Sequence, residues 1–399
     1  MNAYSAAIDP ATARAGLSRL FEPCDNVGAA LVAAAGPEEA LGIASGWIRA
    51  SGSVRDLLHD VLAAHGISNR TGFLESALER WRPRVPDLAP ARDLAIAHRA
   101  GGRLLIPEDE DWPAALDDLE LAAPLCLWVR GAQDVPIPGP ERMAAIVGSR
   151  DCTGYGATVA GDLAAGVVAN GWTVVSGGAY GIDAHAHRAA LAAGGRRPAT
   201  LAVMACGTDR FYPAGNEDLL RAVAAQGLLI SEVPPGSAPT RWRFLQRNRI
   251  IAALCSVTVV AEARWRSGAL NTAHHAAGLG RAVAAVPGSV YSANSAGCHR
   301  LLRDGSAVCI TDSSELRELA GPMGGGAGPE PQVQAAAHDG LAVEDILLLD
   351  ALPVRSGSTV EKLAAVAGLP PAAVRAGLGR LEVSGLAERA APDAWRRRK

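Results

Sequence analysis

The sequence lacks several features that would assign it to a common class of enzyme or metalloprotein. No Gly-Lys pair occurs in its 399 residues, so the phosphate-binding loop of the P-loop ATPases is absent. Its seven cysteines are scattered and form no CxxC pair, which argues against a zinc site or a disulfide framework and favours a reducing compartment. Lysine is almost missing, with Lys362 and Lys399 as its two occurrences, so arginine carries nearly all of the positive charge.

Long apolar segments are missing as well. No run of 18 or more uninterrupted apolar residues exists, and the N-terminus lacks a basic region followed by an apolar core. We therefore expect no membrane span, no membrane partner, no signal peptide and a cytoplasmic location.

What the sequence does contain is a dense arginine stretch. Residues 241–303 hold nine arginines against a single acid, Glu262, although the whole chain has a formal net charge of −3. Such a concentration of positive charge is typical of a protein that binds a polyanion. The alternative is a solvated face in a chain that prefers arginine to lysine, but that preference does not explain why acids are missing here. The nine are Arg241, Arg243, Arg247, Arg249, Arg264, Arg266, Arg281, Arg300 and Arg303.

Strand and helix patterns alternate through the middle of the chain. Apolar segments recur at roughly the spacing of successive βαβ units, and their continuous hydrophobicity predicts strands covered on both faces. The predicted strands are 144–147, 173–176, 200–205, 228–230, 257–261 and 282–286, with a short last strand at 307–310. The predicted intervening helices are 157–170, 184–193, 217–225 and 269–278. These features predict an α/β fold with a parallel sheet, which binds ligands at the carboxyl ends of its strands.

The flanking segments differ in pattern from this core. Residues 1–85 alternate Ala/Leu-rich helical patterns with Gly/Pro breaks and predict a small helical domain of the SAM-like kind. The main α/β domain is predicted over 86–320, and a Gly/Pro-rich flexible linker over 321–337. Residues 338–399 predict a winged helix-turn-helix domain, with helices at 343–351, 360–367 and 371–383 and a basic tail.

Small and polar residues follow several predicted strands. Gly148-Ser149-Arg150 follows the first strand, Ser176-Gly177-Gly178 ends the second, and Ser267-Gly268 opens the helix after the fifth. Glycine allows a ligand close to the backbone, and a helix N-terminus offers free N–H groups to an anion. By contrast, Asp183, His185 and His187 lie two apart on a helix and face different directions, so we expect capping and packing there and no metal site.

Taken together and in order, these motifs resemble those of the bacterial DNA-processing protein A family (DprA, also called Smf). The resemblance covers residues 100–312 strongly and both flanks loosely. It implies an extended Rossmann core that binds single-stranded DNA and protects incoming strands, a homodimer, and loading of RecA recombinase during natural transformation. It implies no catalysis and no cofactor. The motifs are Gly148-Ser149-Arg150, Ser176–Asp183 with Ala186-His187, Tyr212-Pro213 with Asn216, Arg247–Ile251, Ser267–Leu270 and Pro287-Gly288.

The resemblance and the strand-end argument predict one DNA site. We expect Arg150 and Arg249 to point into one crevice and contact phosphate, and either Phe244 or Trp242 to stack a base, although core packing of these aromatics is an equal alternative. The amides near Gly177 and Gly268 are expected to bind phosphate as well. The predicted DNA-binding residues are Gly148, Ser149, Arg150, Ser176, Gly177, Gly178, Phe244, Arg247, Asn248, Arg249, Ser267 and Gly268.

Two departures from the family pattern concern His299, where members often have Asn, and Ser-Gly-Gly at 176–178, where Ser-Gly-Leu is commoner. The first leaves the role of the 295–300 loop open. The alternative function is a nucleotide hydrolase that resembles the phosphoribohydrolases of the related Rossmann group. This chain lacks their PGGxGTxxE signature, and Glu262 and Asp183 are its plausible catalytic carboxylates.

Overall fold

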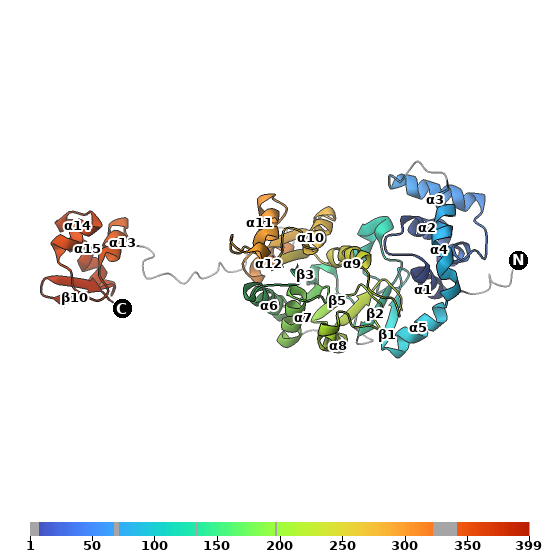
Figure 1. Cartoon of the computed structure of the whole chain (residues 1–399), viewed down its shortest axis with the longest axis horizontal. Helices are drawn as coiled ribbons and strands as arrows, with labels where there is room; N and C mark the ends of the chain where they lie inside the picture. Colours follow the sequence, from blue (N-terminus) through green and yellow to red (C-terminus); the bar gives the residue numbers. More distant parts are fainter. Residues whose placement is uncertain (1–7, 68–71, 132–134, 196–197, 322–340, 399) are drawn as a thin grey trace. The chain divides into compact units, whose positions relative to one another are not determined.

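A nine-stranded sheet organises the larger of the two units into which the chain divides, residues 1–328 and 329–399 (Figure 1). The computed structural model describes residues 8–67, 72–131, 135–195, 198–321 and 341–398. The predicted linker at 321–337 therefore lies, apart from Gly321, outside the described residues. The strands are β1 (Gly102–Leu105), β2 (Leu127–Gly131), β3 (Met143–Gly148), β4 (Thr173–Ser176), β5 (Thr200–Val203), β6 (Leu228–Ser231), β7 (Val257–Glu262), β8 (Ala282–Ala285) and β9 (Val308–Cys309).

The strand order is β1-β2-β6-β5-β4-β3-β7-β8-β9, and the seven strands from β6 to β9 run parallel. All six strands predicted from apolar runs form within two residues of their predicted bounds, and the short last strand forms as β9. Strands β1 and β2 were not predicted. Strand β1 pairs antiparallel with β2, and β2 pairs antiparallel with β6, which extends the sheet beyond the parallel core.

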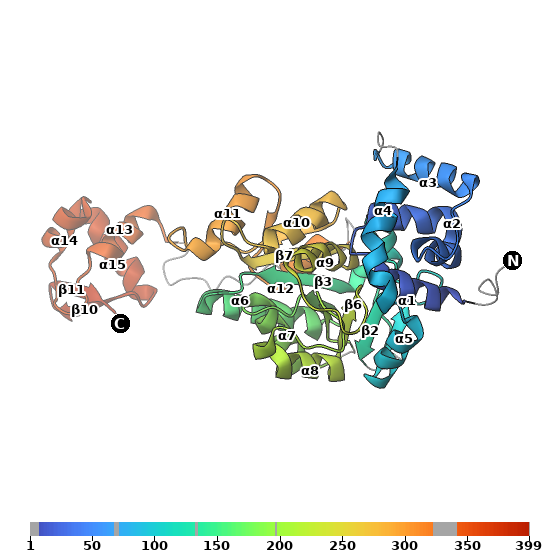
Figure 2. The same cartoon turned by 45° about the vertical axis from the view of Figure 1, so that its right-hand side comes forward.

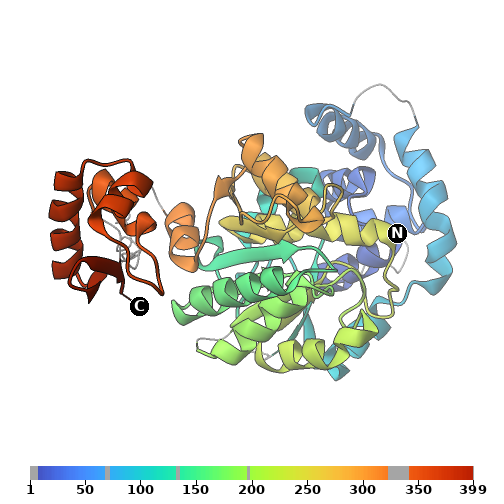
Figure 3. The same ribbon diagram turned by 60° about the vertical axis from the view of Figure 1, so that its left-hand side comes forward.

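Helices cover both faces of the sheet. Alternate residues of each strand point to opposite faces, and both sets of residues are apolar. Along β3, Ala145 and Val147 belong to the apolar cluster of α9 and α10, whereas Ala144 and Ile146 belong to that of α6, α7 and α12. Figures 2 and 3 show the sheet between these two layers. The helices are α6 (Gly154–Ala169), α7 (Ile182–Ala193), α8 (Glu217–Gln226), α9 (Arg241–Leu254), α10 (Ala269–Gly278), α11 (Ala296–Arg303) and α12 (Ser313–Ala320).

Helix α9 was not predicted, although it contains the start of the arginine stretch. Thr240 caps its N-terminus by accepting a hydrogen bond from the amide of Arg243. The residues from Arg247 to Leu254 are all buried, so the second half of the helix has no exposed face and no amphipathic period. Helix α9 also carries the chain from β6 back across the sheet to β7, which pairs with β3. The sheet therefore changes direction of winding between β3 and β7.

The N-terminal segment forms a helical cluster within the same unit as the sheet. Its elements are α1 (Pro10–Leu20), α2 (Asn26–Ala44), α3 (Gly52–Ala64), α4 (Phe73–Trp81), the 3-10 helix η1 (Arg82–Asp87) and α5 (Pro90–Arg99). Helix α2 is, among the described helices, the one long and apolar enough to cross a membrane. Its backbone is broken at Gly36, where φ is 76°, and half of it is buried, as expected for a core helix.

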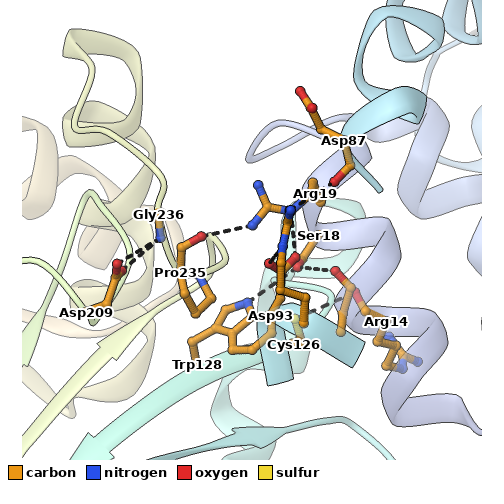
Figure 4. Close-up of polar contacts among 12 residues, drawn as sticks. Arg14, Ser18, Arg19, Asp87, Asp93, Cys126, Trp128, Asp209, Pro235 and Gly236 are labelled. Carbon is orange, nitrogen blue, oxygen red and sulfur yellow. Dashed lines mark hydrogen bonds and ion pairs between the residues drawn. The ribbon is translucent and has the colours of Figure 1, made fainter. Parts of the chain in front are cut away.

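Polar contacts fasten this helical cluster to the loop that precedes α9. Arg19 of α1 donates to the carboxylate of Asp93 in α5 at 2.6 Å and to the carbonyl of Pro235 at 2.9 Å (Figure 4). The next amide, that of Gly236, donates to Asp209. The loop between β6 and α9 is thus held from both sides, which fixes the entry of α9.

The second unit contains three helices and a hairpin around its own apolar core. The helices α13 (Val343–Ala351), α14 (Val360–Ala367) and α15 (Pro371–Val383) have the predicted bounds. The predicted basic tail instead belongs to an antiparallel hairpin, β10 (Ala387–Ala391) with β11 (Ala394–Arg397). Trp395 of β11 packs into the core formed by Leu348, Leu363 and Leu378.

Candidate functional site

A cavity of about 290 Å³ opens where β3 and β7 lie side by side at the carboxyl edge of the sheet. This is the position where ligands bind in open α/β sheets. Its walls come from the end of β3, the start of α7, helix α9, the turn after β7 and the start of α10. Eight of the twelve predicted residues line it, namely Gly148, Ser149, Arg150, Phe244, Arg247, Asn248, Ser267 and Gly268.

Arg247 forms the cavity floor. Its Nη1 donates to the carbonyls of Gly177 and Val203, and its Nε donates to the side chain of Asn248 at 3.3 Å. Burial lowers the pKa of Arg247 from its ordinary value, and the nearby carboxylate of Asp183 opposes that shift. Carbonyl groups therefore hold the guanidinium in place, and Asp183, which lines the same cavity, offsets part of its charge.

The Ser176-Gly177-Gly178 segment supports Arg247 and does not line the cavity. The amides of Gly177 and Ala179 both donate to Oδ2 of Asp183, at 3.1 and 3.3 Å, so the Gly177 amide is not free for phosphate as predicted. Ser176 is buried and donates to the carbonyl of Ile146. A side chain at Gly177 would collide with the Arg247 guanidinium, which explains the glycine.

Arg249 does not point into the cavity, contrary to the prediction that it contacts phosphate there. Its guanidinium donates to both carboxylate oxygens of Glu232, at 2.8 and 2.6 Å, and to the carbonyls of Ala122 and Gln246. It is 2% exposed and does not line the cavity. Residues two apart on a helix point about 200° apart, so Arg247 and Arg249 cannot face the same crevice.

Arg150 and Phe244 form the rim. The exposed guanidinium of Arg150 lies 5.0 Å from the ring centre of Phe244, and that of Arg247 lies 5.7 Å from the same ring. The ring of Tyr212 is also 5.7 Å away. Phe244 lines the cavity, whereas Trp242 is 53% exposed and does not. Of the two aromatics considered for base stacking, Phe244 is the one beside the predicted phosphate ligands.

The α10 side of the cavity is built by Ser267 and Gly268. Ser267 accepts a hydrogen bond from the amide of Ala269 at 3.3 Å, and Gly268 precedes the helix without a side-chain cap. Asn248 joins α9 to this segment by donating to the carbonyl of Gly268 and to the side chain of Asn271. Asn248 thus holds the two cavity walls together.

The fold neutralises much of the arginine stretch. Acids from outside the stretch pair with Arg243, Arg249, Arg264 and Arg281, and Asp304 pairs with Arg300 and Arg303. The sequence count therefore overstates the free charge. Within the described residues, Arg150, Arg241, Arg247 and Arg266 form no ion pair with an acid, and all but Arg241 line the cavity.

Two arginines that line the cavity were not among the predicted site residues. Arg264 and Arg266 belong to the arginine stretch and follow the carboxyl end of β7, which was the signal that could have identified them. The cavity also contains Asp151, which pairs with Arg264, and Asp183. Four arginines against two aspartates give the lining a net positive charge. In the described part of the chain, no group of three His, Cys, Asp or Glu residues could hold a metal ion.

The two carboxylates considered for catalysis are both engaged. Asp183 accepts the two amides described above, and burial raises its pKa. Glu262 is buried and accepts the amide and hydroxyl of Thr153, at 2.8 and 2.6 Å, just before α6. His299, which departs from the family pattern, lies with its Nε2 3.0 Å from the carbonyl of Gly288 and does not line the cavity.

Comparisons with known proteins agree with this architecture. A sequence model of a family described as DNA recombination-mediator protein A matches residues 103–321. A DprA protein of Mycobacterium tuberculosis is 44% identical over 392 residues, which are 96% of this chain and 93% of that protein. The DNA processing protein DprA of Streptococcus pneumoniae is 40% identical over 211 residues, 53% of this chain and 72% of that protein. The X-ray structure of Streptococcus pneumoniae DprA has a TM-score of 0.58 at 31% identity and covers 75% of this chain and 93% of its own.

The family match spans more than half of this chain, and the similarity to the Mycobacterium tuberculosis protein spans nearly all of it. The matched residues include every segment that lines the cavity. The chain therefore belongs to the DNA recombination-mediator protein A family, also called DprA.

Proposed function

We propose that the cavity between β3 and α10 binds single-stranded DNA. One observation carries this proposal. Three arginines that form no ion pair with an acid line a single cavity at the strand ends, together with one aromatic ring. Phosphates would contact Arg150, Arg247 and Arg266, and a base would stack beside Phe244. Positive grooves with stacking aromatics are the usual means of holding an unpaired strand.

A single strand fits this cavity better than a duplex. The guanidinium groups of Arg150 and Arg247 both lie over the Phe244 ring on the cavity wall. A base therefore reaches this ring only when the base is unpaired and unstacked from its neighbours. The cavity also presents no helix of the length and exposure that would enter a major groove, since the second half of α9 is buried.

The test is the affinity for single- and double-stranded oligonucleotides of one sequence, measured over a salt series without ATP and with a chelator present. We expect the single strand to bind more tightly, and its log Kd to rise with log salt concentration because arginines displace counterions. Equal or tighter duplex binding by a chain that ends at Gly321, or a magnesium requirement, would contradict the proposal.

The family names support a wider role. We propose that the protein protects incoming single strands and passes them to a RecA-type recombinase during DNA uptake, as a cytoplasmic homodimer without enzymatic activity. The domain division is a helical SAM-like domain to residue 85, the DNA-binding domain at 86–320 and a winged helix at 338–399. The test is whether the protein speeds RecA filament assembly on strands that are already coated with single-strand-binding protein, with sedimentation to measure the oligomer.

The nucleotide hydrolase remains the second candidate, but its carboxylates have other partners. Asp183 accepts backbone amides that follow β4, and Glu262 accepts the amide of Thr153 just before α6. A free base released from nucleoside monophosphates by the purified protein, and lost in Asp183→Asn, would favour hydrolysis over strand binding.

A further inference from the structure

Trp265 lies in a tight turn beside the cavity and is not part of the cavity site. The amide of Ser267 donates to the carbonyl of Arg264 at 3.0 Å, which makes Trp265 and Arg266 the two central residues of the turn between β7 and α10. The Trp265 side chain is 50% exposed and does not line the cavity, whereas its neighbours Arg264 and Arg266 both do.

An arginine of helix α11 lies over this indole. The guanidinium of Arg300 in α11 lies 5.2 Å from the Trp265 ring centre, which is within the range of a cation–π contact. Arg300 also pairs with Asp304 on its own helix at 3.5 Å. Part of the indole is therefore covered by the Arg300 guanidinium, and the exposed part remains open to a ligand.

The backbone of the turn is equally fixed. The amide of Ala263 donates to the carbonyl of Asn294, and the amide of Gly297 donates to the carbonyl of Ala263, both at 2.7 Å. Arg264 Nε donates to the side chain of Asn294 at 2.8 Å. A Cβ at Gly297 would lie 2.8 Å from the carbonyl oxygen of Arg264, so α11 packs directly against the turn. A preorganised aromatic loses little conformational entropy when it binds.

We propose that Trp265 stacks a base of the single strand immediately outside the cavity, so that the strand site continues from the cavity over the β7–α10 turn toward α11. The inference rests on the proposed strand binding and extends it to a second stacking position. Arg266, which lines the cavity and has no acidic partner in the described part of the chain, would hold the phosphate between the two positions. Aromatic rings stack every base, so this contact would not select sequence.

The decisive experiment compares wild type, Trp265→Ala and Trp265→Phe on deoxythymidine oligonucleotides of increasing length, beginning at about four nucleotides. We expect Trp265→Ala to bind the shortest strands like wild type and to lose about tenfold in affinity once the strand is long enough to leave the cavity. Trp265→Phe should recover most of that loss. The salt dependence should not change, because stacking displaces no counterion.

Two matched variants separate stacking from other effects. Trp47→Ala removes a part-exposed tryptophan of the helical cluster and should leave affinity unchanged at every length. Arg300→Ala should reduce long-strand affinity by less than Trp265→Ala and keep the salt dependence, because Arg300 positions the ring and does not contact phosphate. A weaker salt dependence in Arg300→Ala would overturn that assignment.

Several outcomes would overturn the inference. Equal loss on short and long strands would place Trp265 inside the cavity site, and no loss at any length would remove it from the strand path. If Trp265→Ala fails to fold, photocrosslinking of wild type to strands with 5-bromodeoxyuridine decides the matter: crosslinks must map to the peptide that contains Trp265. A wild-type protein that binds no single strand of any length would instead refute the proposed function itself.

Discussion

Arg249 and Glu232 form a buried two-point ion pair between α9 and the end of β6. The two N···O distances are 2.8 and 2.6 Å, and Arg249 also donates to the carbonyl of Ala122. The pair lies on the side of α9 opposite to Arg247, which faces the cavity. Helix α9 therefore uses one arginine to hold its place and another to present charge.

Arg249→Ala should destabilise the fold by about 3–5 kcal/mol, because it leaves the Glu232 carboxylate buried without its partner. The denaturation midpoint in urea measures this loss. In whatever fraction remains folded, the salt dependence of strand binding should equal that of wild type. Glu232→Gln is the matched variant and should also destabilise. A folded, stable Arg249→Ala with a weaker salt dependence would return Arg249 to the DNA site.

The sequence could predict the parallel sheet but not this pair. Continuous β-branched and aliphatic runs identify buried strands without knowledge of their neighbours, so β3 to β8 were found. Strands β1 and β2 form through antiparallel pairing, β1 with β2 and β2 with β6, which no local pattern specifies. Helix α9 could not be predicted, because its second half is buried on all sides and shows no amphipathic period.

The site shows a similar division. Glycine and serine after strands indicated an edge of the sheet at which a cavity lies, and eight of the twelve predicted residues line that cavity. Counting charge in a window of sequence failed because Glu22, Asp118 and Asp151, which neutralise arginines of the stretch, come from distant segments. Partners of that kind become visible only in three dimensions.

Arg150→Ala should weaken binding of all strands alike, because phosphate contacts carry no sequence information. The slope of log affinity against log salt should become shallower by about 0.7, the value for one lost contact on a single strand. Arg150 is exposed and has no acidic partner in the described residues, so the melting temperature should stay near that of wild type. An unchanged slope with normal folding would exclude Arg150 from the site.

The control for that experiment is Arg99→Ala, which removes an exposed arginine from α5 and should change neither slope nor stability. Arg14, which its place in the helical segment suggests as a control, is unsuitable. It is buried and pairs with Glu108 at 2.8 Å while donating to the carbonyl of Leu125. Arg14→Ala should therefore lower stability without any effect on the salt slope.

Gly177→Ala tests how Arg247 is held. The added methyl group would occupy the position of the Arg247 guanidinium and displace it from the carbonyls of Gly177 and Val203. We expect weaker strand binding together with a stability loss of about 1–3 kcal/mol, as for an overpacked core. Gly154→Ala, where no atom lies within 4 Å of the new methyl group, is the matched control and should change neither quantity. Wild-type affinity in Gly177→Ala would show that the position of Arg247 does not matter.

Removal of the second unit should leave strand binding largely intact. The cavity lies within residues 1–328, and the second unit has its own core of Leu348, Leu363, Leu378 and Trp395. A chain that ends at Gly321 should keep its affinity within about tenfold, or 1.4 kcal/mol. A larger loss, measured on the same oligonucleotide and salt series, would make the second unit part of the DNA site.

The buried His187 should make the fold sensitive to acid. Burial lowers its pKa to about 3, and its Nδ1 lies 2.7 Å from the hydroxyl of Thr200. Between the unfolded pKa of 6.5 and the folded value near 3, the unfolded chain binds a proton that the folded chain does not. Stability attributable to this group is therefore complete above pH 6.5 and falls as the pH decreases.

The expected contribution is a loss of about 2 kcal/mol between pH 6.5 and pH 5, since each unit of pH in that window costs 1.36 kcal/mol. Urea midpoints of wild type and His187→Gln at the two pH values isolate it, because all other titrating groups are common to both proteins. The variant should be less stable at pH 7 but should lose less on acidification. Burial raises the pKa of Asp183, so its contribution to the pH dependence of stability has the opposite sign to that of His187. Both proteins contain Asp183, so its contribution cancels when they are compared. An identical loss in both proteins would mean that the pKa of His187 is the same in the folded and unfolded states.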